Sequence, residues 1–282
     1  MEEKRLDLSD RDFIQGKLRQ LDLCLSDYSF VTLFLYRKKR EILLVKDTVS
    51  YLKGLSRDGE KIIIPLDSME LGFDVYSQLL LEGSCQYLYP IPEKHLLLFQ
   101  KGPFFIEEKV EWSDYIYQTK KMSTYPGRSL AGRRNLVKQF KIENSYEVVA
   151  FSDNLKEKAI DLLKEWKNEH EVEGDYLALL EALNLLEPLY IQGIGILIDG
   201  ELSAFTLGSE LKKDVFDIHF GKARRGVKGI YQTLYQELAL SLDPQFKWMN
   251  FEQDLGLPGL RESKRQYIPD HMERVWKVGI KR

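Results

Sequence analysis

The feature that most constrains the fold is a pair of apolar segments, IQGIGILI (191–198) and ELSAFTLGSEL (201–211), joined by Asp199-Gly200. An Asp-Gly pair between two such segments is typical of a tight hairpin, because the central positions of its turn need a positive φ. The segment VFDIHFGKA (215–223) follows and predicts a third strand. The sequence therefore predicts an antiparallel meander in the second half of the chain.

Helices are expected on both sides of this meander. Two segments before it repeat apolar residues every three or four positions, as amphipathic helices do. After it, a glycine-containing loop leads into a helix, a strand, a short helix and a last strand. In order, the predicted elements are helices 154–170 and 176–186, loop 224–229, helix 230–242, strand 246–252, helix 260–267 and strand 274–278.

The first half follows a similar order. A helix at 10–21 precedes several short strands, with Asp58-Gly59 as a turn signal between two of them. A helix and a further strand then follow. The predicted elements are strands 28–36, 41–45, 48–55 and 61–66, helix 67–82 and strand 86–89. The repeated order predicts a duplicated α/β (α+β) unit, with domains at 1–111 and 112–282.

Composition indicates a globular chain without a membrane span. Apolar residues make up 44% of the 282 residues, which is enough for packed cores. No apolar run reaches the roughly 18 to 20 residues of a membrane helix, and the charged start MEEKRLDLSDRD lacks the core of a signal peptide. We therefore expect no transmembrane segment and a cytoplasmic location.

Cysteines and histidines predict neither a metal nor a redox site. Cys24 and Cys85 show no CxxC spacing, so reduced, structural thiols are expected. The histidines show no spacing such as HExxH, and neither a GxSxG elbow nor a Walker loop occurs. We expect no metal.

The segment 119–141 carries seven cations and no carboxylate, although the whole chain has a net charge of −3. Arginines suit bidentate contacts to phosphate, so Arg128, Arg133 and Arg134 are candidates for binding a polyphosphate or a tRNA end. The alternative is a solvated basic helix face.

The loop RRGVKG before the helix at 230–242 predicts a second anion site. Backbone N–H groups at a helix N-terminus attract phosphate, and glycine permits close approach. Arg224, Gly226, Lys228 and Gly229 are the candidate residues. The alternative is an ordinary solvated basic turn.

Polar residues are concentrated in NFEQDLGLPGLRESKRQYIP (250–269). Glu252 and Asp254 share one face if the strand continues that far, and Arg261 and Lys264 share a face of the short helix. These residues and Tyr267 are candidates for orienting a donor and moving a proton. The alternative is a salt bridge that fastens the last helix. In the strand at 215–223, Asp217, His219 and Gly221 alternate, so His219 is either a base or a buried, hydrogen-bonded histidine.

Three segments carry a family resemblance: GRSLAGRRNLVKQF (127–140), the helix after GKARRGVKG (221–229), and the stretch 250–269. They resemble a bacterial family related to the C-terminal catalytic domain of phosphatidylglycerol lysyltransferases, over most of residues 112–278. The order of elements looks like the GNAT acyltransferase fold. The glycines of RRGVKG lie three apart, whereas the usual GNAT loop has the form Arg/Gln-x-x-Gly-x-Gly/Ala.

The resemblance implies two tandem GNAT-like domains, each with a mixed, mostly antiparallel sheet flanked by helices. It also implies an acyl- or aminoacyltransferase that moves an activated acyl group from aminoacyl-tRNA or acyl-CoA to an amine or hydroxyl. The donor would be a substrate, so no permanently bound cofactor is expected, and tRNA is the expected partner. The alternative function is a non-catalytic module that binds tRNA, a nucleotide or a protein.

Overall fold

The structure is a computed structural model that describes residues 2–168 and 175–281. The predicted helix at 154–170 forms from Lys156 to Asn168, and its expected last residues, 169 and 170, lie outside the described residues.

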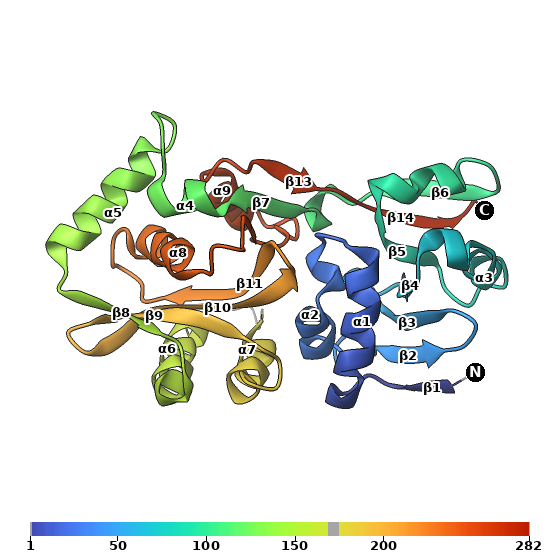
Figure 1. Cartoon of the computed structure of the whole chain (residues 1–282), viewed down its shortest axis with the longest axis horizontal. Helices are drawn as coiled ribbons and strands as arrows, with labels where there is room; N and C mark the ends of the chain where they lie inside the picture. Colours follow the sequence, from blue (N-terminus) through green and yellow to red (C-terminus); the bar gives the residue numbers. More distant parts are fainter. Residues whose placement is uncertain (1, 169–174, 282) are drawn as a thin grey trace. The chain divides into compact units, whose positions relative to one another are not determined.

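Two seven-stranded sheets form the framework (Figure 1). Their orders are β1-β2-β3-β4-β5-β14-β6 and β13-β7-β12-β11-β10-β9-β8. In the first sheet the meander β1 to β4 is antiparallel and β5 runs parallel to β4. In the second sheet the meander β8 to β11 is antiparallel and β12 runs parallel to β11. Both sheets are therefore mixed and mostly antiparallel, as predicted.

The strands of the first sheet are β1 (Glu2–Arg5), β2 (Leu43–Lys46), β3 (Ser50–Leu55), β4 (Lys61–Pro65), β5 (Tyr87–Pro92), β14 (Val275–Ile280) and β6 (Phe104–Glu108). Those of the second are β13 (His271–Glu273), β7 (Asp114–Gln118), β12 (Trp248–Asn250), β11 (Val215–Ala223), β10 (Glu201–Lys212), β9 (Gln192–Ile198) and β8 (Tyr146–Ala150). The α-helices are α1 (Arg11–Leu21), α2 (Phe30–Leu35), α3 (Met69–Leu81), α4 (Thr119–Thr124), α5 (Ala131–Glu143), α6 (Lys156–Asn168), α7 (Tyr176–Asn184), α8 (Ile230–Ser241) and α9 (Pro258–Arg265). Short 3-10 turns lie at Leu8–Asp10, Ser26–Tyr28, Glu93–Phe99, Val110–Trp112 and Asp153–Leu155.

The chain divides by contacts into two compact units. The first contains the residues up to Asp114, the segment Gln253–Gly256 and the residues from Met272 onward. The second contains Tyr115–Glu252 and Leu257–His271. The last strand, which the sequence analysis assigned to the second domain, is thus the sixth strand of the first sheet, between β5 and β6.

In the first unit, α3 packs against one side of the sheet. Tyr76 and Leu80 of α3 are buried with Ile63 of β4, Leu88 of β5 and Val278 of β14 in one apolar cluster. The helix begins at Ser68, whose side chain accepts a hydrogen bond from the Leu71 N–H group and so caps it. The connection β4-α3-β5 is therefore a buried crossover between parallel strands.

The prediction of a strand at 28–36 is wrong, because residues 30–35 form helix α2. Ser29 caps this helix by accepting from the Thr32 N–H group. All six residues of α2 are buried, so the segment is apolar on every side and shows no helical period. A short apolar run of this kind does not distinguish a buried strand from a buried helix.

In the second unit, α8 covers one face of the sheet and α6 and α7 cover the other (Figure 1). The hairpin predicted at Asp199-Gly200 is present, with φ of 52° and 81° at the two residues, and joins β9 to β10. Helix α8 connects β11 to the parallel strand β12. The basic segment forms α4 and α5, and both helices pack against α8. Each unit thus repeats a meander, a crossover helix and a parallel strand.

Candidate functional site

Three adjacent strands of the second unit bring the principal polar cluster together. In the sheet, Asp217 of β11 lies opposite Ser209 of β10 on one side and Asn250 of β12 on the other. His219 follows Asp217 at an alternate position, and Glu252 follows Asn250 just past the end of β12. The cluster therefore stands on a rigid part of the sheet.

A β-bulge occurs at His219. Leu207 pairs with Phe220, but the next residue, Gly208, pairs with Ile218, so His219 is the extra residue of β11. A bulge bends the strand locally and changes the direction of a side chain. The simple alternation expected from the sequence does not include this irregularity.

The backbone holds Glu252 in a conformation that side chains rarely adopt. Its φ is +56°, in the left-handed region. The N–H group donates to Asn250 Oδ1 at 2.7 Å, and the carbonyl accepts from the Tyr115 N–H group at 3.2 Å. Because β12 ends at Asn250, the assumption that Glu252 and Asp254 alternate along a continuing strand is wrong.

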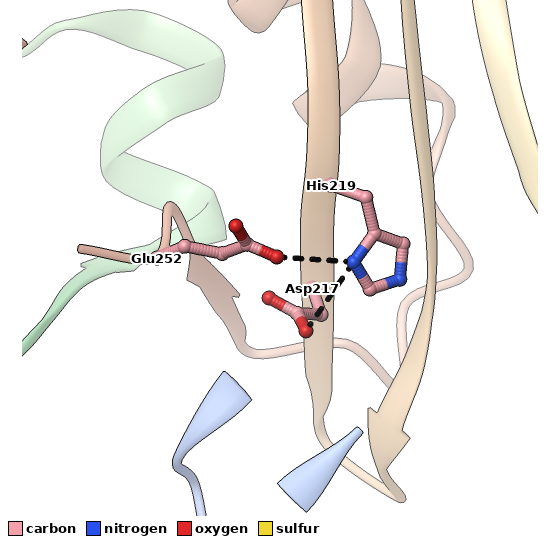
Figure 2. A group of neighbouring side chains, drawn as sticks. All are labelled: Asp217, His219 and Glu252. Atoms are coloured by element: carbon pink, nitrogen blue, oxygen red, sulfur yellow. Dashed lines mark hydrogen bonds and ion pairs between the residues drawn. The ribbon is translucent and has the colours of Figure 1, made fainter. Parts of the chain in front are cut away.

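Figure 2 shows that the imidazole of His219 faces two carboxylates. Its Nδ1 lies 3.1 Å from Glu252 Oε1 and 3.7 Å from Asp217 Oδ2. Its Nε2 lies 2.8 Å from Ser209 Oγ. The exposed fractions of the side chains are 0% for Asp217, 3% for His219 and 24% for Glu252, so Glu252 is the member of this trio that solvent reaches best.

A neutral imidazole has two tautomers in this arrangement. With the proton on Nδ1, His219 donates to Glu252 and accepts from the Ser209 hydroxyl; with the proton on Nε2, the hydroxyl accepts and the Nδ1 lone pair faces both carboxylates. In either state the ring is held from both sides. The cluster can therefore orient the Glu252 carboxylate or offer a set of nitrogen and oxygen ligands.

In the division of the chain into two units, Asp254 belongs to the first unit and the cluster to the second. Asp254 is 2% exposed, and its Oδ1 accepts from the Gly256 N–H group at 2.8 Å. This contact stabilises the turn before α9. The catalytic role expected of Asp254 stays a prediction.

Lys264 and Tyr267 are buried in the second unit. Lys264 Nζ donates to the carbonyl of Phe251, and Tyr117 donates from its hydroxyl to the Lys264 carbonyl at 2.7 Å. Tyr267 is 3% exposed and packs edge-on against Tyr235 at a centroid distance of 5.9 Å. Burial raises the pKa of the Tyr267 hydroxyl, and nearby Arg133 opposes this by less. Lys264 thus fastens α9 to the segment after β12, while Tyr267 packs two residues beyond the end of the helix. The catalytic roles expected of Lys264 and Tyr267 stay predictions. Arg261 is half-buried on the same helix.

The glycine loop forms a pocket of about 320 Å³ at the N-terminus of α8. Gly226 and Gly229 have φ of +78° and +80°, and Gly229 takes the N-cap position, where it provides no side-chain cap. Arg224 and Lys228 are exposed. The pocket is lined by Ala223, Arg224, Arg225, Gly226, Val227, Ile230 and Tyr231.

The arginines of the basic segment have different surroundings. Arg134 donates to the carbonyls of Tyr125 and Gly127 and so holds the loop before α5. The Arg133 guanidinium lies 6.0 Å from the centre of the Tyr267 ring. Arg128 is exposed. Arg134 therefore has a structural role, because it satisfies two backbone carbonyls of this loop.

Sequence reasoning missed Ser209 as a member of the cluster and gave Asp217 no role. The alternation of Asp217 and His219 was the available signal for the aspartate. No local pattern marks Ser209, because its proximity to His219 comes from the pairing of β10 with β11.

The repeated meander, crossover helix and parallel strand define a tandem GNAT-like protein with the fold of acyl and aminoacyl transferases. The chain belongs to the family of phosphatidylglycerol lysyltransferase C-terminal domains, whose family model matches residues 82–278. Among the described residues, no helix has the length and apolar character needed to cross a membrane.

Solved structures show the same fold. A conserved protein of unknown function from Bacteroides thetaiotaomicron is 23% identical, with a TM-score of 0.90 and 99% of both chains covered. A C-terminal domain (DUF2156) from Agrobacterium fabrum, described as that of a lysylphosphatidylglycerol synthetase, is 13% identical, with a TM-score of 0.68 over 97% of this chain and 92% of that one. L-PGS from Bacillus licheniformis is 15% identical, with a TM-score of 0.60 over 82% and 81%. A search of curated proteins finds no match.

Proposed function

We propose that this protein transfers an activated acyl group from aminoacyl-tRNA or acyl-CoA to an amine or a hydroxyl of an acceptor. The observation that carries the proposal is the pocket at the N-terminus of α8, with Gly226 and Gly229 in its loop and Arg224 and Lys228 beside it. Membership in a lysyltransferase family supports an aminoacyl donor.

The pocket suits a phosphate of the donor for two physical reasons. The N–H groups of the first turn, which have no acceptor within the helix, and the dipole of a twelve-residue helix make its N-terminus favourable for an anion. Exposed Lys228 adds positive charge that a phosphate would neutralise, and so does exposed Arg224, although its Nε lies 3.6 Å from the Glu165 carboxylate and the phosphate would compete with that ion pair. Gly226 is exposed and a Cβ there would meet open space, so a phosphate can approach the backbone of the loop at this residue.

The basic segment gives a tRNA donor a second place to bind. Exposed Arg128 and Lys138 are available for contacts to phosphates, whereas Arg134 already holds backbone carbonyls. Such contacts provide affinity that is independent of sequence and falls with salt.

In this proposal the acceptor binds beside Glu252. Its carboxylate is partly exposed and can accept a hydrogen bond from an attacking amine or hydroxyl, while His219, 3.1 Å away, holds it from the buried side. His219 and Ala223 lie four residues apart on β11, a distance on the order of 13 Å. One strand therefore carries both the polar cluster and the first residue of the pocket.

Turnover is tested by measuring how much donor is consumed in the presence of a cell extract that supplies acceptors. Bulk aminoacyl-tRNA and acetyl-CoA are each incubated with the full chain, an Arg224→Ala/Lys228→Ala variant and a Glu252→Gln variant. The proposal expects depletion of one donor, a raised KM in the first variant and a reduced kcat in the second. A donor that binds but is never consumed would instead identify a binding module.

Binding of bulk aminoacyl-tRNA across a salt series tests the donor class separately. Replacing Arg128 and Lys138 by alanine should reduce the slope of log affinity against log salt by about 1 to 2, since each phosphate contact contributes about 0.9. A Lys39→Ala/Lys61→Ala variant removes two exposed lysines of the first unit and serves as the matched control. Equal slopes in all three proteins would exclude phosphate contacts by the basic segment.

A further inference from the structure

We infer that Asp217, His219 and Glu252 bind a divalent transition-metal ion of the Zn²⁺ class. One donor atom from each of the three residues lies within 4.8 Å of the other two. The inference does not depend on the proposed transfer reaction, because it concerns the affinity of the cluster for an ion.

The spacing of the donor atoms fits an ion after small movements. Bonds of about 2.0 to 2.2 Å place neighbouring ligand atoms roughly 2.8 to 3.6 Å apart in octahedral or tetrahedral coordination. His219 Nδ1 lies 3.1 Å from Glu252 Oε1 and 3.7 Å from Asp217 Oδ2. The two distances therefore need changes of only a few tenths of an ångström. The donor oxygens of the two carboxylates lie within 4.8 Å of each other and must approach by up to about 1.2 Å around the ion.

The second nitrogen of His219 is already placed as in a metal-bound histidine. A histidine that ligates through one nitrogen usually donates the N–H group of the other to an oxygen. Here Nε2 lies 2.8 Å from Ser209 Oγ, which can accept that hydrogen bond. The imidazole would then be neutral and its Nδ1 would be free to bind the ion. Figure 2 shows that this nitrogen faces both carboxylates.

Burial and charge favour the ion further. Asp217 is fully buried and His219 nearly so, and removing a carboxylate from water costs several kcal/mol unless opposite charge compensates it. Two carboxylates and a neutral imidazole match the charge of a divalent cation. Partly exposed Glu252 leaves the cluster reachable by an ion from solvent.

The ligand types select the class of metal. One imidazole with two carboxylates suits Zn²⁺, whereas Mg²⁺ prefers octahedral oxygen ligands and keeps several waters, and Ca²⁺ takes six to eight oxygens. Three protein ligands are also the number found in zinc sites that keep an open position. The sequence shows no metal spacing because Glu252 lies just past the end of a different strand, 33 residues after His219.

The first experiment measures Zn²⁺ and Mg²⁺ binding to the full chain after chelator treatment, by isothermal titration and by metal content after dialysis. The expected result is one Zn²⁺ per chain and much weaker binding of Mg²⁺. Asp217→Asn and His219→Gln each remove a ligand and should weaken Zn²⁺ binding by about 100-fold or more. Losing a residue that only hydrogen-bonds to a ligand already weakens metal binding by about 10- to 100-fold.

Two milder variants keep the test valid if Asp217→Asn or His219→Gln does not fold. Ser209→Ala keeps all three ligands and should weaken binding by about 10- to 100-fold. Glu252→Gln alters a partly exposed side chain and should change the visible absorption spectrum of the Co²⁺-loaded protein, which reports the ligands directly. Circular dichroism of each variant verifies that it is folded.

The first unit offers a matched control. His95 Nδ1 lies 3.1 Å from Glu70 Oε1, the same separation as in the cluster, but this pair is not part of a three-ligand group among the described residues. His95→Gln should leave Zn²⁺ binding unchanged. The inference is wrong if the wild-type protein binds no Zn²⁺, if Ser209→Ala binds Zn²⁺ as tightly as the wild type and Glu252→Gln leaves the Co²⁺ spectrum unchanged, or if His95→Gln abolishes binding.

Discussion

The buried ammonium group of Lys264 donates to the backbone carbonyl of Phe251, thirteen residues earlier in the chain. This contact holds α9 against the segment that follows β12. Lys264 is 8% exposed although it is charged, so its position is that of a structural cation that satisfies a carbonyl.

Replacing Lys264 by methionine should therefore lower the stability of the protein. The change keeps an apolar stem but leaves the Phe251 carbonyl without this donor, which costs about 1 to 3 kcal/mol in free energy of unfolding. Urea denaturation measures the loss. Arg265→Met, at an exposed neighbouring position, should stay within about 0.5 kcal/mol of the wild type. Loss of activity with unchanged stability in Lys264→Met would instead assign the lysine to the chemistry.

The two glycines of the loop before α8 should respond differently to alanine. Gly226 and Gly229 both have a positive φ, so each substitution brings a conformational cost of about 1 to 2 kcal/mol. A Cβ at Gly226 meets no atom within 4 Å, but one at Gly229 would lie 2.3 Å from the Leu136 carbonyl oxygen of α5. Backbone must move there, which adds about 1 to 3 kcal/mol.

Thermal and urea unfolding of the Gly226→Ala and Gly229→Ala variants would give this difference directly. Gly226→Ala serves as the control for φ alone. Equal destabilisation of the two variants would contradict the close packing of the loop against α5.

Elements that are marked by neighbouring residues in the sequence, such as a turn dipeptide or an apolar period, were predictable. The Asp199-Gly200 hairpin follows from the dipeptide and its flanking apolar segments, and α8 follows from its periodicity after the glycine loop. Helix α2 was not predictable by periodicity because it is buried on every side. The place of β14 in the first sheet depends on pairing with β5, far away in sequence, which no local pattern records.

The candidate site was predicted only in part for the same reason. Glu252 and His219 were identified as polar residues near strand ends, but their 3.1 Å contact depends on the bulge in β11 and the positive φ of Glu252. Ser209 joins them through strand pairing alone. The charge of Lys264 was visible in the sequence and its buried carbonyl partner was not, and its expected role in chemistry stays a prediction.

Cys85 should be unreactive in the folded protein. It is 6% exposed, and burial raises the pKa of its thiol to about 12, so almost no thiolate is present at pH 8. With a thiol reagent such as Ellman's reagent at pH 8, Cys85 should react at the rate of unfolding, and urea should accelerate it. A Cys24→Ser variant removes the half-buried second thiol so that the signal comes from Cys85 alone. Rapid reaction of folded Cys24→Ser would contradict the burial of Cys85.

The buried carboxylate of Asp27 should make the stability of the protein depend on acidic pH. Arg57 Nη1 donates to both carboxylate oxygens at 3.0 Å, Arg40 Nη1 donates at 3.2 Å and the Tyr89 hydroxyl donates at 2.7 Å. Burial acts to raise the pKa of Asp27, but Arg57 and Arg40 together outweigh it, and the pKa lies below its ordinary value. The ionised form is therefore the one that folding favours.

Because the folded pKa lies below the unfolded value of about 3.9, the stabilisation is fully present above pH 4 to 5 and is lost as pH falls through the folded pKa. Asp27→Asn should cost about 3 to 5 kcal/mol at pH 7, as expected for breaking a buried ion pair. Urea denaturation from pH 7 to pH 3 should show the wild type approaching the variant as the pH falls. Asp12→Asn, in an exposed pair with Arg11, should cost less than about 1 kcal/mol. A constant difference between wild type and Asp27→Asn across this range would contradict a lowered pKa, because the asparagine variant has no carboxylate to titrate at this position.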